Sequence, residues 1–180
     1  MEKISIRNAT FAKIGLQDMI DYIGGHINIS KVIMAEIGSY VGDSTEIFAR
    51  SVQKIYAIDP WKNGYDENDN ASHQHRMEII EKQFDKCIVN VYGNVTKIKG
   101  KSLESVLIFD DDYFDVVYID GMHTYGEVKR DIQAWLPKIR KGGFICGHDY
   151  QGKFPGTIQA VDEFKQPDKI FRDTSWCVRV

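Results

Sequence analysis

The sequence has few cysteines, and their spacing does not suggest a disulfide or zinc framework. Cys87, Cys146 and Cys177 are odd in number, lie far apart and form no C-x-x-C pair. Each lies in or next to an apolar run, so we expect buried, reduced thiols rather than disulfide partners or zinc ligands. Reduced thiols are typical of the cytoplasm, where we therefore expect the protein.

Long apolar runs and an excess of basic charge are also missing. A membrane-spanning helix needs about 20 apolar residues; no run approaches that length, and MEKISIRNATF lacks the apolar core of a signal peptide. Lys and Arg number 23 against 26 Asp and Glu, giving a formal net charge of -3, and they are scattered along the chain. Proteins that bind nucleic acid usually show a basic face or stripe. Neither a membrane nor a nucleic acid is therefore an expected partner.

What the sequence does contain is enough apolar material for one ordinary globular domain. Its 180 residues are 43% hydrophobic, which suffices for a full core. We expect one domain over 1–180, with an N-terminal helical segment at 1–30 and a ligand-binding core at 31–180. No internal repeat or low-complexity segment interrupts it.

The stretch from Val32 to Trp61 reads as strand, tight turn, helix and strand. Val32–Ala35 and Ile55–Ile58 are apolar runs typical of strands buried on both faces of a parallel sheet. Glycines bracket the turn between them, where a ligand can lie against bare backbone. The second strand delivers Asp59 to its carboxyl end, about 20 residues past the turn, where an acid is placed to hold ribose hydroxyls.

The local charge indicates which nucleotide-like ligand the turn suits. The dinucleotide fingerprint G-x-G-x-x-G is absent; the spacing is E-x-G-x-x-x-G, and no Lys or Arg occurs from Val32 to Ala49. Glu36, Asp43 and Glu46 are all negative there, which disfavours a pyrophosphate. This local excess of negative charge favours S-adenosylmethionine, which carries an ammonium and a sulfonium beside its adenosine. An ordinary strand-helix-strand unit without a ligand is the alternative.

Alternating apolar runs and helix-like stripes continue through the rest of the chain. Their alternation predicts an α/β fold, an open parallel sheet with helices on both faces. Further strands are expected at 87–92, 114–119, 144–147, 169–172 and 176–180, and helices at 10–23, 77–84, 101–106, 125–139 and 157–164.

Several polar residues follow the expected strand ends and should meet at one edge of the sheet. Two of them, Asp120 and Asp149, could hold a hard divalent cation, with His148 beside one of them. The alternative has Asp120 capping its helix and Asp149 bonding loop amides. The residues expected at this edge are Asp59, Asn94, Asp120, His123, His148 and Asp149.

Long motifs support a family resemblance. The stretches AEIGSYVGDST, YAIDPW, FDVVYIDGMHTYGEVKRDIQAWLPKIRKGGFICGHDY and FPGTIQAVDEF lie between about residues 32 and 180. Together they resemble the class I S-adenosylmethionine-dependent methyltransferases, and within them the small macrocin O-methyltransferase and cephalosporin hydroxylase-like group. The resemblance implies a Rossmann-like, doubly wound, mostly parallel sheet of seven strands whose last strand is antiparallel.

The resemblance also implies roles for individual residues. Asp59 would hold the cofactor ribose, and Asp120 would lie beside the cofactor. In metal-dependent relatives the acids of the I-D-G and H-D-Y strings bind Mg²⁺, which carries over to Asp120 and Asp149; their third metal ligand has Tyr150 in its place here. The methionine end of the cofactor is expected at Glu36, Gly38, Ser39 and Gly42, and its adenine near Trp61 and Asn94.

The function expected from these features is methyl transfer to a hydroxyl of a small-molecule or sugar acceptor. Asp120 would take part in catalysis through a metal, and His123 or His148 would take the proton. A cofactor-binding module without transferase activity and a metal-dependent hydrolase are the rivals. The polar loop from Lys62 to His75 is a candidate for acceptor binding. Acceptor identity and association into a homo-oligomer are left open by the sequence.

Overall fold

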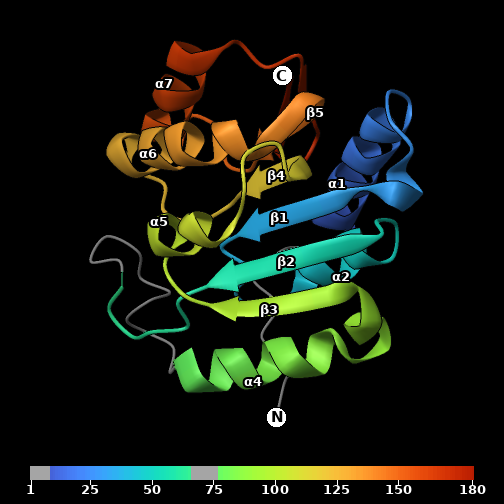
Figure 1. Cartoon of the computed structure of the whole chain (residues 1–180). Helices are drawn as coiled ribbons and strands as arrows, with labels where there is room; N and C mark the ends of the chain where they lie inside the picture. The colour runs from blue at the N-terminus through green and yellow to red at the C-terminus, as the bar shows by residue number, and fades with distance from the viewer. Residues whose placement is uncertain (1–8, 66–76) are drawn as a thin grey trace.

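The computed structural model describes residues 9–65 and 77–180, which form a seven-stranded sheet in the order β3-β2-β1-β4-β5-β7-β6. Neighbouring strands from β3 to β5 run parallel, and β7 runs antiparallel to β5 (Figure 1). The expected α/β fold and antiparallel last strand are confirmed. The strands are β1 Ile33–Ile37, β2 Lys54–Asp59, β3 Val95–Lys99, β4 Phe114–Ile119, β5 Ile139–Gly147, β6 Lys169–Ile170 and β7 Trp176–Arg179.

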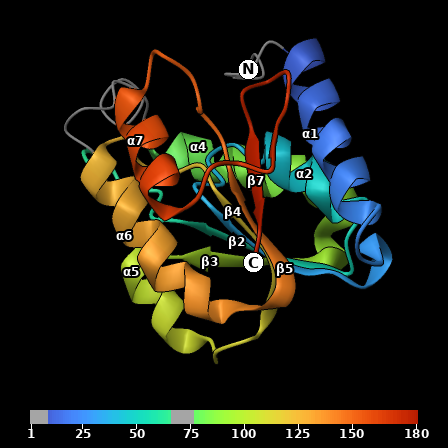
Figure 2. The same cartoon turned by 90° about the horizontal axis from the view of Figure 1, so that it is seen from above.

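Helices cover both faces of this sheet and bury a separate core on each. One core packs α1, α2 and α4 on the sheet, and the other packs η3, α6 and α7 on the opposite face. Figure 2 shows α1 and α2 on one side and α5, α6 and α7 on the other. The α-helices are α1 Ala9–Gly24, α2 Asp43–Ala49, α4 Met77–Cys87, α5 Ser102–Ser105, α6 Tyr125–Trp135 and α7 Pro155–Phe164, and the 3₁₀ turns are η1 Ile29–Lys31, η2 Val89–Asn94, η3 Val106–Ile108 and η4 Leu136–Lys138.

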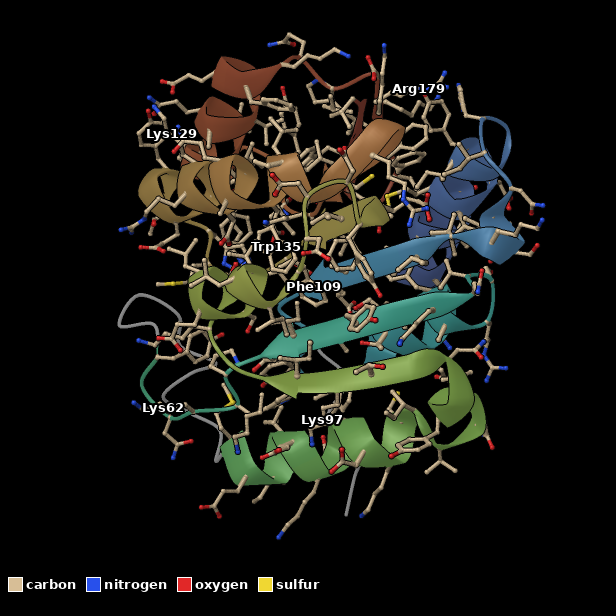
Figure 3. The ribbon with its side chains drawn as sticks, viewed as in Figure 1. Lys62, Lys97, Phe109, Lys129, Trp135 and Arg179 are labelled. Atoms are coloured by element: carbon tan, nitrogen blue, oxygen red, sulfur yellow. The ribbon has the colours of Figure 1, made fainter. Side chains whose placement is uncertain are left out.

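The side chains that fill these cores are the ones the apolar periodicity singles out. Val128, Ile132 and Trp135 form the buried stripe of α6. Trp135 is fully buried and meets Phe109 with ring centroids 5.9 Å apart (Figure 3). Aromatic rings at such distances attract one another beyond the effect of burial alone. Trp135 also meets Phe114, the first residue of β4, with centroids 5.9 Å apart, so this packing fixes the last turn of α6 over the amino end of β4.

The third strand is where the sequence prediction was wrong. The run from Cys87 to Tyr92 is the end of α4 followed by η2, and β3 begins only at Val95. Within that run Ile88 and Val91 are buried while Val89 is 64% exposed, a three-residue spacing that suits a 3₁₀ turn rather than a strand.

The shift also moves Asn94 away from its predicted place. It precedes β3 rather than following a strand, so it lies at the amino edge of the sheet. There its Nδ2 donates to the carbonyl of Ala49 at 3.0 Å. Asn94 therefore ties α2 to β3, and the prediction that it follows a strand end at the carboxyl edge of the sheet was wrong.

Helix α6 is shorter than the apolar stripe suggested. It ends at Trp135, the turn η4 contains Pro137, and β5 starts at Ile139 opposite Phe114 of β4. Pro137 has no backbone N–H to donate to a carbonyl one turn earlier, which favours a helix end at this point. Among the described residues no helix is both long and apolar enough to cross a membrane.

The loop from Lys62 to His75, expected to bind the acceptor, lies mostly at 66–76, outside the described residues.

Candidate functional site

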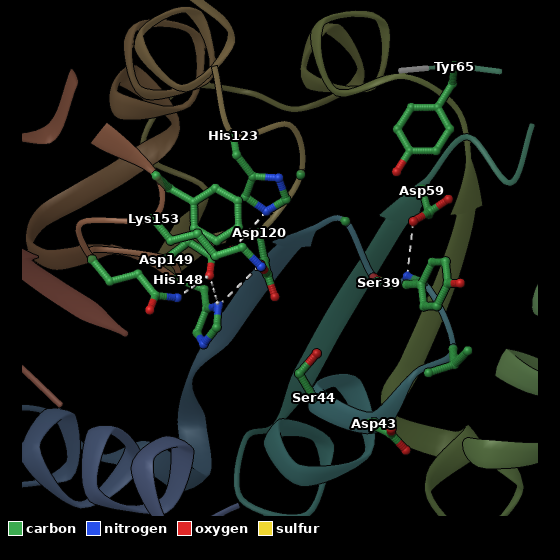
Figure 4. A pocket seen from close by; sticks show the side chains of 16 residues that line it. Ser39, Asp43, Ser44, Asp59, Tyr65, Asp120, His123, His148, Asp149 and Lys153 are labelled. Atoms are coloured by element: carbon green, nitrogen blue, oxygen red, sulfur yellow. Dashed lines mark hydrogen bonds and ion pairs between the residues drawn. The ribbon is translucent and has the colours of Figure 1, made fainter. Parts of the chain in front are cut away.

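Two cavities open side by side where β1, β2, β4 and β5 end. The first, about 410 Å³, is called here the His123 cavity, and the second, about 440 Å³, the Asp131 cavity. Gly38, Asp59, Tyr65 and Gly121 line both. Figure 4 shows the histidines grouped on one side of the His123 cavity and Asp59 with Tyr65 on the other. The two cavities at the carboxyl edge of the sheet are therefore adjacent and share part of their lining.

The turn after β1 requires glycine. Gly38 has φ +88, and a Cβ there would overlap the backbone carbonyl of Asp120. Its N–H donates to Ile58 at 2.9 Å, which holds the turn against β2. Only a residue without a Cβ accepts this backbone shape and this close approach together. The turn after β1 and the turn after β4 therefore touch each other directly.

Glu36 stabilises the turn after β1 from its buried side. It is fully buried and accepts hydrogen bonds from Ser39 Oγ at 2.8 Å, from Ser44 Oγ at 2.5 Å and from Thr45 Oγ1. Burial raises its pKa, and the three hydroxyl bonds oppose that rise. Ser39 and Ser44 line the His123 cavity, but Glu36 and Gly42 do not. The expectation that Glu36 and Gly42 contact the ligand needs correction, because they shape the turn from behind it.

Asp59 ends β2 at the junction of the two cavities. Its side chain accepts from the N–H of Tyr40 at 2.9 Å and from the N–H of Trp61 at 2.7 Å. Burial raises its pKa to about 6, although both backbone bonds act in the opposite direction. A carboxylate fixed by two backbone donors is well placed to accept hydrogen bonds from a diol across the junction.

Trp61 does not form a stacking surface. Its ring is 2% exposed, packs on Phe84 with centroids 4.8 Å apart, and donates from Nε1 to the carbonyl of Tyr40 at 2.8 Å. It lines neither cavity. The ring therefore belongs to the core below the turn rather than to the lining of either cavity.

An acid with two histidines forms the far wall of the His123 cavity. Asp149 Oδ2 lies 2.8 Å from His123 Nε2, and Asp149 Oδ1 lies 3.1 Å from His148 Nδ1. Burial raises the pKa of Asp149, but the bonds to both imidazoles outweigh it and hold that pKa well below its usual range. His123 also stacks on Phe154, with centroids 4.7 Å apart. Asp149 is therefore a charged group that orients both rings.

The same wall contains a candidate metal centre. Asp120, His123 and Asp149 each offer a ligand atom within 4.8 Å of the others. Tyr150, in place of the third ligand of metal-dependent relatives, turns away and donates to Asp162 at 2.7 Å. Two carboxylates with retained waters can hold Mg²⁺, whereas an imidazole in the set suits Mn²⁺ or Zn²⁺ better. The residues fit a divalent ion, and they do not require it to be Mg²⁺.

Sequence reasoning missed the polar group of the second cavity. Ser102 Oγ donates to Asp131 Oδ1 at 2.5 Å and accepts from Trp135 Nε1 at 2.8 Å. Asp131 is 6% exposed, and burial raises its pKa to about 6 against the Ser102 bond. The signal was present, because Asp131 interrupts the apolar stripe of Val128, Ile132 and Trp135 on α6.

This raised pKa predicts how stability depends on pH. Folded Asp131 keeps a proton that the unfolded chain, with a pKa of about 3.9, has released. Its contribution to stability therefore falls as pH rises from about 4 to about 6 and stays low above that. We expect Asp131→Asn to exceed the wild type in unfolding free energy by about 1 to 2 kcal/mol at pH 8 and to match it near pH 4. Urea unfolding at both pH values measures this.

The control for this prediction is Asp110→Asn, which changes an exposed acid of the same kind. It should leave the unfolding free energy within about 0.5 kcal/mol of the wild type at both pH values, because substitutions of exposed surface residues usually change stability little. A stability gain from Asp131→Asn that is equal at pH 4 and pH 8 would contradict a burial effect on the charged form.

Comparison with known proteins agrees with this fold. A ribosomal RNA methylase from Streptococcus thermophilus superimposes with a TM-score of 0.59 at 13% identity, covering 97% of this chain and 96% of that one. Phosphoethanolamine N-methyltransferase 1 of Haemonchus contortus, solved with phosphoethanolamine and S-adenosylhomocysteine, gives 0.56 at 15% identity, covering 82% of this chain and 28% of that one.

The relatives found by sequence match this chain over only part of their own length. Protein R132 of Acanthamoeba polyphaga mimivirus is 30% identical over 124 residues, which is 64% of this chain and 50% of R132. Protein y4gI of Sinorhizobium fredii is 25% identical over 125 residues, 64% of this chain and 13% of y4gI. This chain thus spans at most half the length of these two relatives. Residues 35–150, more than half of the sequence, match the methyltransferase domain family. The chain therefore belongs to the methyltransferase domain family.

Proposed function

We propose that the chain is an S-adenosylmethionine-dependent methyltransferase acting on a hydroxyl of a small molecule or sugar. The observation that carries the proposal is the position of Asp59, buried at the junction of two cavities. A cofactor laid across the junction would place its ribose on Asp59. Its adenine would then enter the Asp131 cavity and its methionine part the His123 cavity.

The charge of the His123 cavity supports this orientation. Asp43, Asp120 and Asp149 line it, and Lys153 is the single Lys or Arg lining it among the described residues. A cavity lined by acids favours a bound cation over a pyrophosphate. The ammonium and sulfonium of S-adenosylmethionine would meet that requirement.

His123 is the proposed base. In the transfer, the acceptor hydroxyl gives its proton to His123 while its oxygen forms a bond to the methyl carbon. The carbon–sulfur bond breaks, and its electron pair stays on the sulfur of neutral S-adenosylhomocysteine. Asp149 would stabilise the imidazolium, because its low pKa keeps it ionised. His148, 14% exposed in its side chain against 30% for His123, is better placed to position Asp149 than to meet an acceptor.

A divalent ion is the second candidate for activating the acceptor, and the Asp120–His123–Asp149 cluster favours it. Bound there, it would lower the pKa of a coordinated hydroxyl. Asp120 and Asp149 would hold it, and His123 would then be a ligand rather than a free base. A chelator separates the two mechanisms, since only the metal-dependent one stops when the ion is removed.

The test is a search for an acceptor, with formation of S-adenosylhomocysteine as the readout. Phenols, catechols and sugars are incubated with the protein and S-adenosylmethionine, with and without EDTA. We expect turnover with one class, unchanged by EDTA. His123→Ala should lower kcat by about 10²- to 10⁴-fold, the usual contribution of a general base. Its Kd for S-adenosylhomocysteine, measured by calorimetry, should stay within about threefold, a difference of less than about 1 kcal/mol, because His123 is proposed to bind the acceptor and not the cofactor.

His26→Ala is the matched control, because His26 lies outside both cavities and bonds the carbonyl of Tyr22. It should keep full activity. Full turnover by His123→Ala would exclude His123 as the base, and loss of turnover in EDTA would favour the metal. Cofactor binding without turnover on any acceptor would favour a binding module, and metal-dependent hydrolysis without cofactor binding would favour a hydrolase.

A further inference from the structure

Two of the three cysteines face each other across neighbouring antiparallel strands. Cys146 lies in β5 and Cys177 in β7, and the register places the two residues directly opposite one another (Figure 2). Their sulfur atoms are 2.9 Å apart, and both residues are fully buried. A disulfide bond is about 2.05 Å long, so the two sulfurs need to approach by only about 1 Å to form one.

The pairing of the strands favours this approach. In antiparallel strands, residue pairs that exchange backbone hydrogen bonds alternate with pairs that do not, and the side chains of the second kind lie closer together. The N–H of Val180 donates to the carbonyl of Gly143 at 3.0 Å, which makes these two residues a hydrogen-bonded pair. Three positions further along the register, Cys146 and Cys177 therefore form a pair of the second kind. The carbonyl of Cys177 accordingly accepts from Asp168, on the side of β7 away from β5.

A metal does not account for this pair of thiols. Among the described residues, neither Cys146 nor Cys177 belongs to a group of three or more possible metal ligands. A structural zinc takes four ligands, so two thiols alone do not hold one. The pair is therefore either a plain contact in the core beneath α1 or a site of oxidation.

The position of β7 in the sheet gives the thiols a route to an oxidant. Burial raises the pKa of the Cys146 thiol, which keeps it neutral and unreactive while β5 and β7 are paired. Beyond β7 the sheet has only β6, a strand of two residues that are both exposed. Strands at such an edge separate more easily than central ones, and they are unpaired before the chain folds. Oxidation is thus expected during folding or local opening.

We propose that Cys146 and Cys177 form a reversible disulfide, which cross-links β5 to β7 when the chain meets a low-molecular-weight disulfide. The thiolate of one cysteine attacks a sulfur of the oxidant and releases one small thiol. The second cysteine then attacks the mixed disulfide, forms the Cys146–Cys177 bond and releases the other small thiol. In total the two cysteines lose two electrons and two protons, and the oxidant is reduced to two thiols.

The cross-link has a place in the fold that goes beyond the proposed function and does not depend on it. β5 ends at Gly147, and His148 and Asp149 of the His123 cavity follow at once. The disulfide would join the end of that strand covalently to β7. It would therefore anchor the far wall of the His123 cavity to the antiparallel edge of the sheet.

The experiment unfolds the chain in urea and refolds it in excess oxidised glutathione, so that burial does not block the reaction. Free thiols are alkylated, and trypsin, which cuts after Lys and Arg, then releases Cys146 in peptide 142–153 and Cys177 in peptide 173–179. We expect mass spectrometry to find these two peptides joined, and dithiothreitol to separate them. Cys87, which lies at the end of α4, should carry the alkyl group or glutathione instead.

The oxidised protein should also melt about 4 to 16 °C above the reduced protein, because the bond restricts the unfolded chain between two distant positions. Cys177→Ala cannot form the bond and should melt at the same temperature with and without dithiothreitol. Cys146→Ala serves the same purpose if Cys177→Ala does not fold, as judged by circular dichroism. Cys87→Ala is the matched control and should keep both the joined peptides and the rise in melting temperature.

Three results would overturn the inference. The first is a protein refolded in excess oxidised glutathione in which Cys146 and Cys177 are both alkylated or each bound to glutathione. The second is a disulfide that joins Cys87 to either of them. The third is a joined pair without a rise in melting temperature, since the folded strands would then not accommodate the bond.

Discussion

Replacing Asp59 by alanine should weaken S-adenosylhomocysteine binding by at least about 100-fold, because the carboxylate would bond two ribose hydroxyls and each such charged bond contributes about 1.5 to 3 kcal/mol. The change also removes the acceptor of the Tyr40 and Trp61 amides, which frees the turn after β1. Both effects act on the junction of the two cavities. Calorimetric titration with S-adenosylhomocysteine measures the loss directly.

Two variants show whether that loss is specific. Asp110→Ala removes an exposed acid outside both cavities and should leave the Kd unchanged. Asp59→Asn keeps the side-chain volume, but its amide NH2 group would face one of the two backbone N–H donors, so this variant should also bind poorly. Circular dichroism verifies that each variant is folded. A Kd for folded Asp59→Ala within threefold of wild type, a difference of less than about 1 kcal/mol, would remove Asp59 from the ribose site.

Gly38→Ala should lower the unfolding free energy by about 3 kcal/mol or more, because it adds a Cβ at a left-handed position and drives it into a backbone carbonyl. The carbonyl belongs to Asp120, on the turn after β4, and backbone cannot move aside as a flexible side chain can. The two turns must therefore separate or the strands must shift. Urea unfolding followed by circular dichroism measures the loss.

Gly126→Ala is the matched control for this prediction. Gly126 lies in α6, and a Cβ there would meet nothing within 4 Å. Alanine is the better helix former by about 0.5 to 1 kcal/mol, so this variant should be at least as stable as the wild type. Equal stability of Gly38→Ala and Gly126→Ala would show that the contact between the two turns is not tight in solution.

The fold was predictable because its central strands are buried on both faces. Val116 and Val117 of β4 are buried on opposite faces, as are the apolar residues of β1, so these strands read as unbroken apolar runs. The edge strand β3 was missed for the opposite reason. Its Lys97 and Lys99 pair with acids of α4, Asp85 and Glu81, so it carries no apolar run.

The candidate site was predictable only where its residues lie at or just past strand ends. Asp59 is the last residue of β2, Asp120 follows β4 directly, and Asp149 lies two residues past β5, so the structure brings all three to one edge. Ser102 and Asp131 lie on two helices, and their meeting depends on how α5 and α6 pack, which no local pattern encodes. Trp61 follows a strand end but turns into the core, with φ 37, because backbone geometry and not sequence position decides where its ring points.

The shared wall between the two cavities has a consequence for inhibitor chemistry. Gly38, Asp59, Tyr65 and Gly121 border both spaces, so weak fragments found separately in each would end near the same carboxylate. A short tether between such fragments makes the second contact intramolecular and raises its effective concentration to the millimolar range. Selectivity among methyltransferases could then be sought in the half facing His123 and Lys153, while the other half supplies affinity.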